Sequence, residues 1–214
     1  MYAQRDDSAR FDGAYAAAVR EHPDDYGVLW RAARYQYWLA DGASDDGLKK
    51  QRGKAAWDLG ERAAKIRPLG VEGHYFSAIG LGAYAQAIGI FNALTQGLEG
   101  KFNGHVLASL KADEGFNVGG PHLAKGRALY EMPWPKRDLT GCISEMRRAL
   151  ALHPENLRAQ LFLAECQLRD GQAKAAKDTT DQLLAQSVAY DPAEGRRVQQ
   201  RARELMPKIA KELR

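Results

Sequence analysis

Several features that would point to a class of function are scarce or missing in this chain of 214 residues. With only two cysteines, the chain has neither a disulfide scaffold nor a paired-cysteine metal motif. The 21 glycines and 8 prolines are too few for a disordered or collagen-like chain. The longest charge-free stretches contain His, Ser, Gly, Gln, Asn and Thr, which are poor choices for a membrane-spanning helix. The sequence therefore predicts a folded globular protein without a transmembrane segment.

The chain also has no large net charge of either sign, because 31 basic and 27 acidic residues give a formal charge of +4. Such a small imbalance does not indicate a nucleic-acid partner. The basic residues do concentrate over residues 195–214, where only Glu204 and Glu212 oppose them. A solvated outer face of a terminal helix explains this bias. Weak attachment to an anionic membrane surface or an acidic partner is the alternative.

Motifs of catalysis and secretion are missing as well. The chain has no Gly-x-Ser-x-Gly elbow, no phosphate-binding Gly-Lys-Thr loop and no His-Glu-x-x-His pair. The carboxylate pairs Asp24-Asp25 and Asp45-Asp46 stand at predicted helix starts, where capping explains them. We therefore expect no enzyme activity and no cofactor. The sequence as written also contains no signal peptide, because no apolar core precedes a cleavage site.

The sequence does contain a helical repeat. The pairs His22-Pro23, Arg67-Pro68 and His153-Pro154 each close a helical stretch, and the fifth residue before each Pro is Ala. These endings resemble the end of the tetratricopeptide repeat, in which a small residue lets two helices approach closely and Pro stops the second helix. The prolines are farther apart than one repeat length of about 34 residues, so insertions must lie between them.

We expect an all-α, tetratricopeptide-like fold of about ten helices without a sheet, formed as a single domain over residues 1–214. A divergent glycine-rich repeat over 70–133 should contain helices at 71–86 and 88–112, a turn at 115–121 and a helix at 122–130. Helices at 138–152, 154–169 and 172–186 should follow, with a C-terminal capping helix at 191–213. The recurring Gly73, Gly80, Gly82 and Gly89 predict either close helix packing or space for a ligand.

A closer family resemblance lies in the central segments. The stretch Gly70-Val-Glu-Gly-His-Tyr-Phe, the segment running from Gly119-Gly-Pro-His to Pro133, and the ending His153-Pro154 resemble the T-component proteins of tripartite ATP-independent periplasmic (TRAP) transporters. The resemblance covers about residues 55–187. It implies an all-helical, tetratricopeptide-like periplasmic protein, secreted or lipid-anchored, that serves a solute-binding protein and encloses a ligand-sized cavity or pore.

Candidate binding residues follow from the repeat positions. In a tetratricopeptide array the first helix of each pair lines the concave face. Counting from the prolines and from Gly126 places mostly apolar and aromatic side chains there, with a few polar groups that could orient a ligand. The candidates are Trp30, Arg34, Tyr37, Tyr75, Ile79, Leu123, Arg127, Tyr130, Leu161 and Glu165. The same side chains would be plain core if the inserted helix covers them.

The histidines and cysteines leave alternatives open. His74 and His122 occupy equivalent repeat positions and could bind a metal, but no third ligand is spaced near either, which favours hydrogen-bonded structural histidines. His105 has no predicted partner. Cys142 and Cys166 lie at the same height on the two arms of one helical hairpin. A disulfide could form there in an oxidising periplasm, but buried thiols are the default because packed helices usually hold the Cα atoms too far apart.

The leading hypothesis is a periplasmic, non-catalytic component of a transport system that holds an elongated apolar ligand, such as a lipid, sterol or hydrophobic organic molecule, in an interior cavity. That site needs a cavity closed by residues 88–120. The alternative is an adaptor that binds a partner, such as a solute-binding protein or transporter subunit, on an open concave groove.

Overall fold

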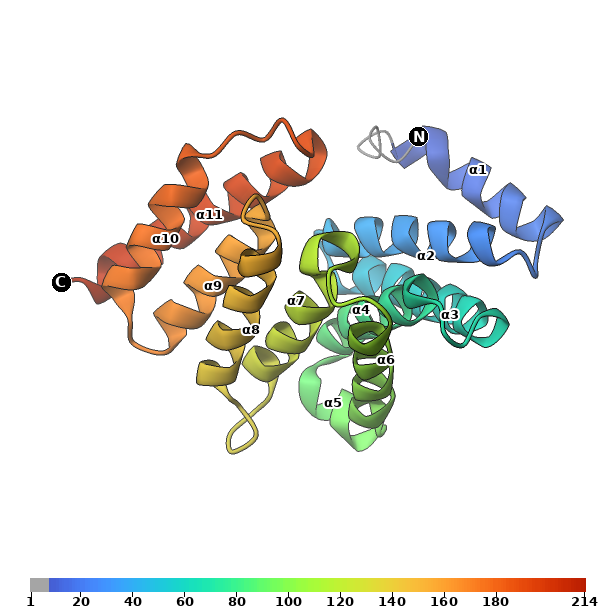
Figure 1. Ribbon diagram of the computed structural model, residues 1–214, viewed down its shortest axis with the longest axis horizontal. Helices are drawn as coiled ribbons and strands as arrows, with labels where there is room; N and C mark the ends of the chain where they lie inside the picture. Colours follow the sequence, from blue (N-terminus) through green and yellow to red (C-terminus); the bar gives the residue numbers. More distant parts are fainter. Residues whose placement is uncertain (1–7) are drawn as a thin grey trace. The chain divides into compact units, whose positions relative to one another are not determined.

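The computed structural model describes residues 8–214, and every regular element within that range is an α-helix (Figure 1). The predicted all-α fold is confirmed, with eleven helices in the described part of the chain. Their bounds are α1 (Ser8–Glu21), α2 (Tyr26–Asp41), α3 (Asp46–Ile66), α4 (Val71–Ile88), α5 (Ile90–Thr95), α6 (Leu98–Ala112), α7 (Phe116–Glu131), α8 (Leu139–Leu152), α9 (Leu157–Arg169), α10 (Ala173–Ala185) and α11 (Pro192–Glu212).

The helices form two compact units. The N-terminal unit ends at Phe116, and the C-terminal unit runs from Asn117 to Arg214. The single domain over residues 1–214 stays a prediction. Each unit has its own buried apolar clusters, so each is described by itself.

In the N-terminal unit, α2, α3 and α4 pack against one another and α6 packs on α4. The carboxylates of Asp25 and Asp45 accept hydrogen bonds from the backbone N–H groups of Val28 and Leu48, both at 2.8 Å. These bonds satisfy helix N-termini that would otherwise lack partners. The capping role predicted for these two acidic residues is therefore confirmed.

The contact between α3 and α4 is unusually close because glycines meet backbone across it. A methyl group added at Gly60 of α3 would lie 2.4 Å from the backbone nitrogen of Ser77. One added at Gly80 of α4 would lie 2.4 Å from the backbone nitrogen of Trp57. Gly53 of α3 and Gly73 of α4 are equally crowded by backbone atoms of the facing helix. These four residues form a glycine seam, so close packing explains Gly73 and Gly80.

The prediction of one continuous helix over residues 88–112 is wrong, because the structure divides this range into two helices. Gly89 and Gly97 have positive φ angles of 86° and 67°, which favour glycine and do not continue a right-handed helix. The chain therefore forms the short α5 between them and starts again as α6.

The C-terminal unit is a layered helical array, in which α9 packs on α8, α10 and α11 (Figure 1). Asp138, Asn156 and Asp191 cap the N-termini of α8, α9 and α11 by accepting hydrogen bonds from backbone N–H groups. The core of α9, α10 and α11 contains the buried residues Leu161, Leu183, Val198, Leu205 and Ile209. The helices predicted over 138–152, 154–169, 172–186 and 191–213 are all present.

A left-handed turn precedes the regular part of α7. Asn117, Val118 and Gly119 all have positive φ angles, at 49°, 54° and 78°. Val118 is the unusual member, since β-branched residues strongly disfavour this conformation. The side-chain amide of Asn156 donates to the carbonyl of Val118 at 2.6 Å and so holds the turn. Pro121 then stands near the start of the right-handed helix, where its missing N–H costs nothing.

The two cysteines form a disulfide that links α8 to α9. Cys142 and Cys166 are both buried, and their Cα atoms are 6.2 Å apart. The default expectation of two separate thiols is wrong, because this hairpin brings the helices within the Cα separation that disulfides require. The surrounding cluster includes Leu123, Ile143 and Met146.

Candidate functional site

Five of the predicted binding residues lie in the N-terminal unit. Trp30, Arg34 and Tyr37 on α2 are half-buried, whereas Tyr75 and Ile79 on α4 are 6% and 9% exposed. Their assignment as ligand contacts stays a prediction. The two α4 residues already pack in the core, so a ligand would reach them only by displacing their neighbours.

An aromatic cluster surrounds two of these residues. The rings of Trp30 and Phe76 stack with centroids 5.9 Å apart, and Tyr75 meets the edge of Phe116 at 5.4 Å. Phe76 and Phe116 also contact each other at 6.0 Å. The guanidinium of Arg34 lies 5.3 Å from the Trp30 ring. Trp30 and Phe116 remain half-buried, which leaves this cluster an apolar surface within the N-terminal unit.

The other five predicted residues lie in the C-terminal unit. Leu123 on α7 and Leu161 on α9 are 6% and 1% exposed and belong to its core. Arg127 and Tyr130 on α7, and Glu165 on α9, are half-buried. The structure therefore brings together the three candidates that carry polar groups, while the two leucines are core residues of the same helices.

Arginine and aromatic side chains alternate across the face formed by α7 and α9. Arg169 and Arg127 lie 4.5 and 4.6 Å from the ring centroid of Tyr130. Arg127 and Arg158 lie 4.9 and 5.9 Å from the ring of Phe162. These five residues form an arginine-aromatic stack, stabilised by attraction between each guanidinium and a ring face.

Carboxylates neutralise the stack. Arg127 forms ion pairs with Glu165 of α9 and, at 2.7 Å, with Glu131 of its own helix. Arg158 of α9 pairs with Glu194 of α11, and its second contact, from Nη2 to Oε2, is 2.9 Å long. Burial lowers the pKa of Arg127, but the charges of Glu165 and Glu131 outweigh this effect, so its pKa is raised. Helices α7, α9 and α11 stand in the place of the first helix of each successive helix pair. Ion pairs join these three helices along one face, which we call the first-helix face.

The sequence missed three of the five stack residues, because the count along α9 selected Leu161 in place of Phe162 and passed over Arg158 and Arg169. Counting from Pro154 gave Leu161 and Glu165, but α9 begins at Leu157, and its partly exposed stripe contains Arg158, Phe162, Glu165 and Arg169. This spacing of three and four residues is the signal of one helical face. Phe162 and the two arginines could have been found by testing both registers.

The histidines have separate partners in the two units. His122 contacts Glu145 at 2.7 Å through Nδ1, and the other carboxylate oxygen of Glu145 accepts from Lys125, also at 2.7 Å. His74 contacts His105, for which the sequence predicted no partner, with 3.0 Å between their Nδ1 atoms. His74 and His122 are both hydrogen-bonded, and their structural role stays a prediction. Within residues 8–214, His, Cys, Asp and Glu side chains form no group of three or more that could hold a metal ion.

Comparison with known families supports the repeat assignment. Residues 137–201 match the tetratricopeptide repeat family, so the chain contains a tetratricopeptide-type repeat in its C-terminal unit. The matched range includes α8, α9 and α10 and therefore most of the stack. No curated protein matches the chain. Between residues 8 and 214, no helix combines the length and the apolar character that crossing a membrane requires.

Proposed function

We propose that the chain is a non-catalytic adaptor that binds a protein partner on the first-helix face of its C-terminal unit. The observation that carries this proposal is the partly exposed arginine-aromatic stack on a tetratricopeptide-type repeat. Stacked repeats present extended concave surfaces to their partners. Tyr and Arg are among the residues that contribute most to protein interfaces.

The charges on this face favour a protein partner over an apolar molecule. Arg127, Arg158 and Arg169 are balanced by Glu131, Glu165 and Glu194, and all six lie at the half-buried or exposed surface. An apolar ligand would remove water from these groups without replacing their hydrogen bonds, which is unfavourable. A protein segment can supply both apolar contacts and matching polar groups.

We further propose that the protein works in the periplasm, where its partner is a solute-binding protein or transporter subunit of a transport system. The resemblance of the Gly119-Gly-Pro-His segment to the T-components of TRAP transporters supports the partner class. The buried disulfide between Cys142 and Cys166 supports an oxidising compartment, since disulfides are rare in reducing ones.

The adaptor proposal is tested by placing a photo-crosslinking amino acid at position 162 and, as a matched control, at exposed Gln182 on α10. Crosslinking in a periplasmic extract followed by mass spectrometry identifies the partner, and the purified partner is then titrated by calorimetry. Replacing Phe162 by Ala should weaken binding roughly 30-fold, the effect of removing one interface hot spot. Crosslinks of equal yield from both positions would contradict the proposal.

Phe162 also packs against the core, so a second variant separates binding from folding. Arg169 is exposed and contacts only Tyr130 within the stack, so its replacement by Ala should lower the melting temperature much less than Phe162→Ala while weakening partner binding. Unchanged binding by both variants would move the interface away from this face.

The N-terminal unit favours a second candidate function, binding of an elongated apolar molecule. The observation behind it is the cluster of Trp30, Tyr75, Phe76 and Phe116, which is apolar and partly exposed. Native mass spectrometry should then show a retained or titratable lipid, sterol or organic molecule near one per chain. Tyr75→Ala should weaken its binding more than it lowers folding stability. Equal loss of both would assign the cluster to the core.

A further inference from the structure

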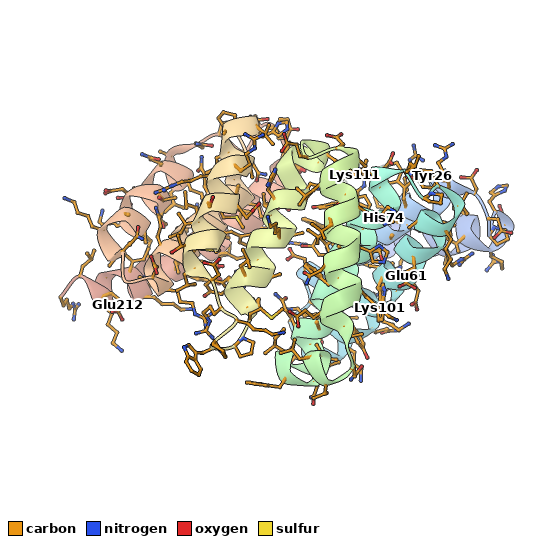
Figure 2. All side chains as sticks on the ribbon, turned by 60° about the horizontal axis from the view of Figure 1, so that its bottom comes forward. Tyr26, Glu61, His74, Lys101, Lys111 and Glu212 are labelled. Carbon is orange, nitrogen blue, oxygen red and sulfur yellow. A yellow bond between two sulfur atoms is a disulfide. The ribbon has the colours of Figure 1, made fainter. Side chains whose placement is uncertain are left out.

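Two histidines join α4 and α6 in the N-terminal unit. Nδ1 of His74 and Nδ1 of His105 are 3.0 Å apart, and the two rings are tilted by 47° with centroids 5.2 Å apart. Figure 2 shows His74 beside α6. Both imidazoles are half-buried, so solvent protons can reach them.

The neighbouring acceptor fixes where the protons lie. Nε2 of His74 is 2.9 Å from the carbonyl oxygen of Pro68, which can only accept, so Nε2 carries a hydrogen. When His74 is neutral, its Nδ1 is therefore unprotonated and accepts from Nδ1–H of His105. Nε2 of His105 is then unprotonated, and it lies 3.8 Å from Oε1 of Glu61.

This arrangement tolerates one added proton but not two. The first proton can bind Nε2 of His105, where it faces the Glu61 carboxylate and leaves the Nδ1 contact intact. A second proton must bind Nδ1 of His74. The Nδ1–H groups of His74 and His105 would then face each other, and both imidazoles would be positively charged. The hydrogen bond between α4 and α6 would therefore be lost.

We propose that the contact between His74 and His105 is an acid-sensitive clasp that holds α6 against α4 and releases it when both imidazoles are protonated. This inference is independent of the adaptor proposal, because it concerns a different unit and a different measurement.

The charged groups around His74 and His105 determine how readily these two imidazoles are protonated. Glu61 of α3 favours the protonated pair and is itself held by the indole N–H of Trp57 at 2.9 Å. Lys101, one turn before His105 on α6, opposes protonation. Glu72 of α4 is engaged by the hydroxyl of Tyr26 from α2 at 2.7 Å.

Opposing effects leave His105 harder to protonate than a free imidazole. Burial and the neighbouring His74 lower the pKa of His105 below its ordinary value of 6.5, although Glu61 acts in the opposite direction. Opening of α6 would free His105 from burial and from His74, so opening is favoured as the pH falls below 6.5.

Separation of α6 from α4 would expose side chains that are now packed between the helices. Leu98, Val106 and Ser109 are the residues of α6 that are buried, and Phe102 packs beside Trp57 and Leu81. These contacts resist separation, so the clasp changes the opening equilibrium of α6 and does not unfold the unit.

Hydrogen exchange by mass spectrometry between about pH 7.5 and pH 5, corrected for the intrinsic exchange rate, tests the clasp in the full chain. Protection of the α6 amides should fall below pH 6.5, by up to about tenfold per pH unit for each proton taken up. Protection of α8 to α10 should not follow the same curve.

The matched variant is His105→Asn. An amide near the Nδ1 position donates to neutral His74 and, after turning over, accepts from protonated His74, so α6 should keep its protection at both ends of the pH range. His22→Asn, at an exposed position, is the control that should keep the wild-type pH response. The proposal is overturned if α6 in the wild-type protein shows no pH response, or if His105→Asn retains one.

Discussion

The two units hold their helices together by different means. In the N-terminal unit the closest contact, between α3 and α4, uses the absence of side chains at Gly53, Gly60, Gly73 and Gly80. In the C-terminal unit a disulfide joins α8 to α9, and ion pairs join α7, α9 and α11. The closest helix contact of the N-terminal unit thus depends on shape, whereas a disulfide and ion pairs cross-link the helices of the C-terminal unit. Ion pairs are not confined to the latter, since Arg52 of α3 pairs with Asp12 of α1.

Because of this difference, the stability of the two units should respond differently to reductant, to salt and to added side-chain volume. Backbone packing at a glycine seam depends on van der Waals contact, which neither reductant nor moderate salt removes. A disulfide is lost by reduction, and ion pairs weaken with salt in proportion to their exposure. Reductant and salt should therefore affect the C-terminal unit more strongly, and side-chain volume added between α3 and α4 should affect the N-terminal unit.

The largest effect is expected from removing the disulfide. Cys142→Ala with Cys166→Ala frees a loop with a sequence separation of 24 residues. The free energy of unfolding of the C-terminal unit should fall by about 3 kcal/mol, chiefly because the unfolded chain gains conformational freedom. Native-state hydrogen exchange measures the loss for each helix separately.

The comparison of the units supplies the control for this experiment. Amides of α3 and α4 should keep their protection in the cysteine-free variant, because no sulfur lies in that unit's seam. An equal loss of protection in α3 and α4 would mean that the two units unfold together and that the contrast between them does not extend to their stability.

The next effect is expected at the seam. Gly60→Ala adds a methyl group where a backbone nitrogen lies 2.4 Å away, so the two helices must move apart. Overpacking of this kind should lower the free energy of unfolding by about 2 kcal/mol, despite the better helix propensity of Ala. Chemical denaturation monitored by tryptophan fluorescence reports this loss, since Trp30, Trp38 and Trp57 lie in the same unit.

Gly104→Ala is the matched substitution. Gly104 lies on the exposed side of α6, and nothing would lie within 4 Å of an added methyl group. This change should stabilise the protein by about 0.5 to 1 kcal/mol through helix propensity alone. Opposite signs for the two Gly→Ala changes would establish that the seam is steric.

Much of the fold could be predicted from the sequence because its signals are local. Proline after a helix end, capping carboxylates such as Asp25 and Asp45, and small residues within helices fix where helices begin, end and approach. The break at Gly97 was missed because a glycine within a helix pattern is usually tolerated at a small cost. Its positive φ depends on how α5 and α6 pack, which local sequence does not specify.

The candidate site was less predictable because it depends on register between helices. Arg127 and Glu165 were predicted separately, but their ion pair depends on the relative rotation of α7 and α9. An error of one residue along α9 exchanged Phe162 for the buried Leu161. The contact between His74 and His105 joins residues 31 positions apart and carries no pattern in the sequence.

A smaller effect is expected from the ion pair between α9 and α11. Arg158 and Glu194 are 12% and 22% exposed, and they form two hydrogen bonds. A double-mutant cycle with Arg158→Met and Glu194→Gln should give a coupling free energy of about 1 kcal/mol at low salt. The same cycle on the exposed pair Lys177–Asp181 should give a smaller coupling, of about 0.3 kcal/mol or less. Similar values for both pairs would remove the ion pairs from the explanation of how the C-terminal unit is held together.

An effect of similar size is expected in the N-terminal unit, and it is lost at high pH. It sharpens the comparison because it comes from a specific hydrogen bond between α2 and α4. The hydroxyl of Tyr26 on α2 donates to Glu72 of α4 at 2.7 Å. Burial and then this carboxylate raise the pKa of Tyr26 from 10.0 to about 12. Since the folded state disfavours the phenolate, the stabilisation is complete below pH 10 and is lost as pH rises from 10 towards 12.

The variant Tyr26→Phe should therefore lower the free energy of unfolding by about 1 kcal/mol near neutral pH and by less near pH 11, where the wild-type protein has lost part of the same contribution. Ultraviolet titration of phenolate absorbance, wild type minus Tyr26→Phe, should give one late-titrating tyrosine. Glu72→Gln should bring that titration back towards 10, because it removes the negative charge and keeps an acceptor in place. If the late titration persists in Glu72→Gln, burial alone raises the pKa, and the link between α2 and α4 is one of packing, as it is at the glycine seam.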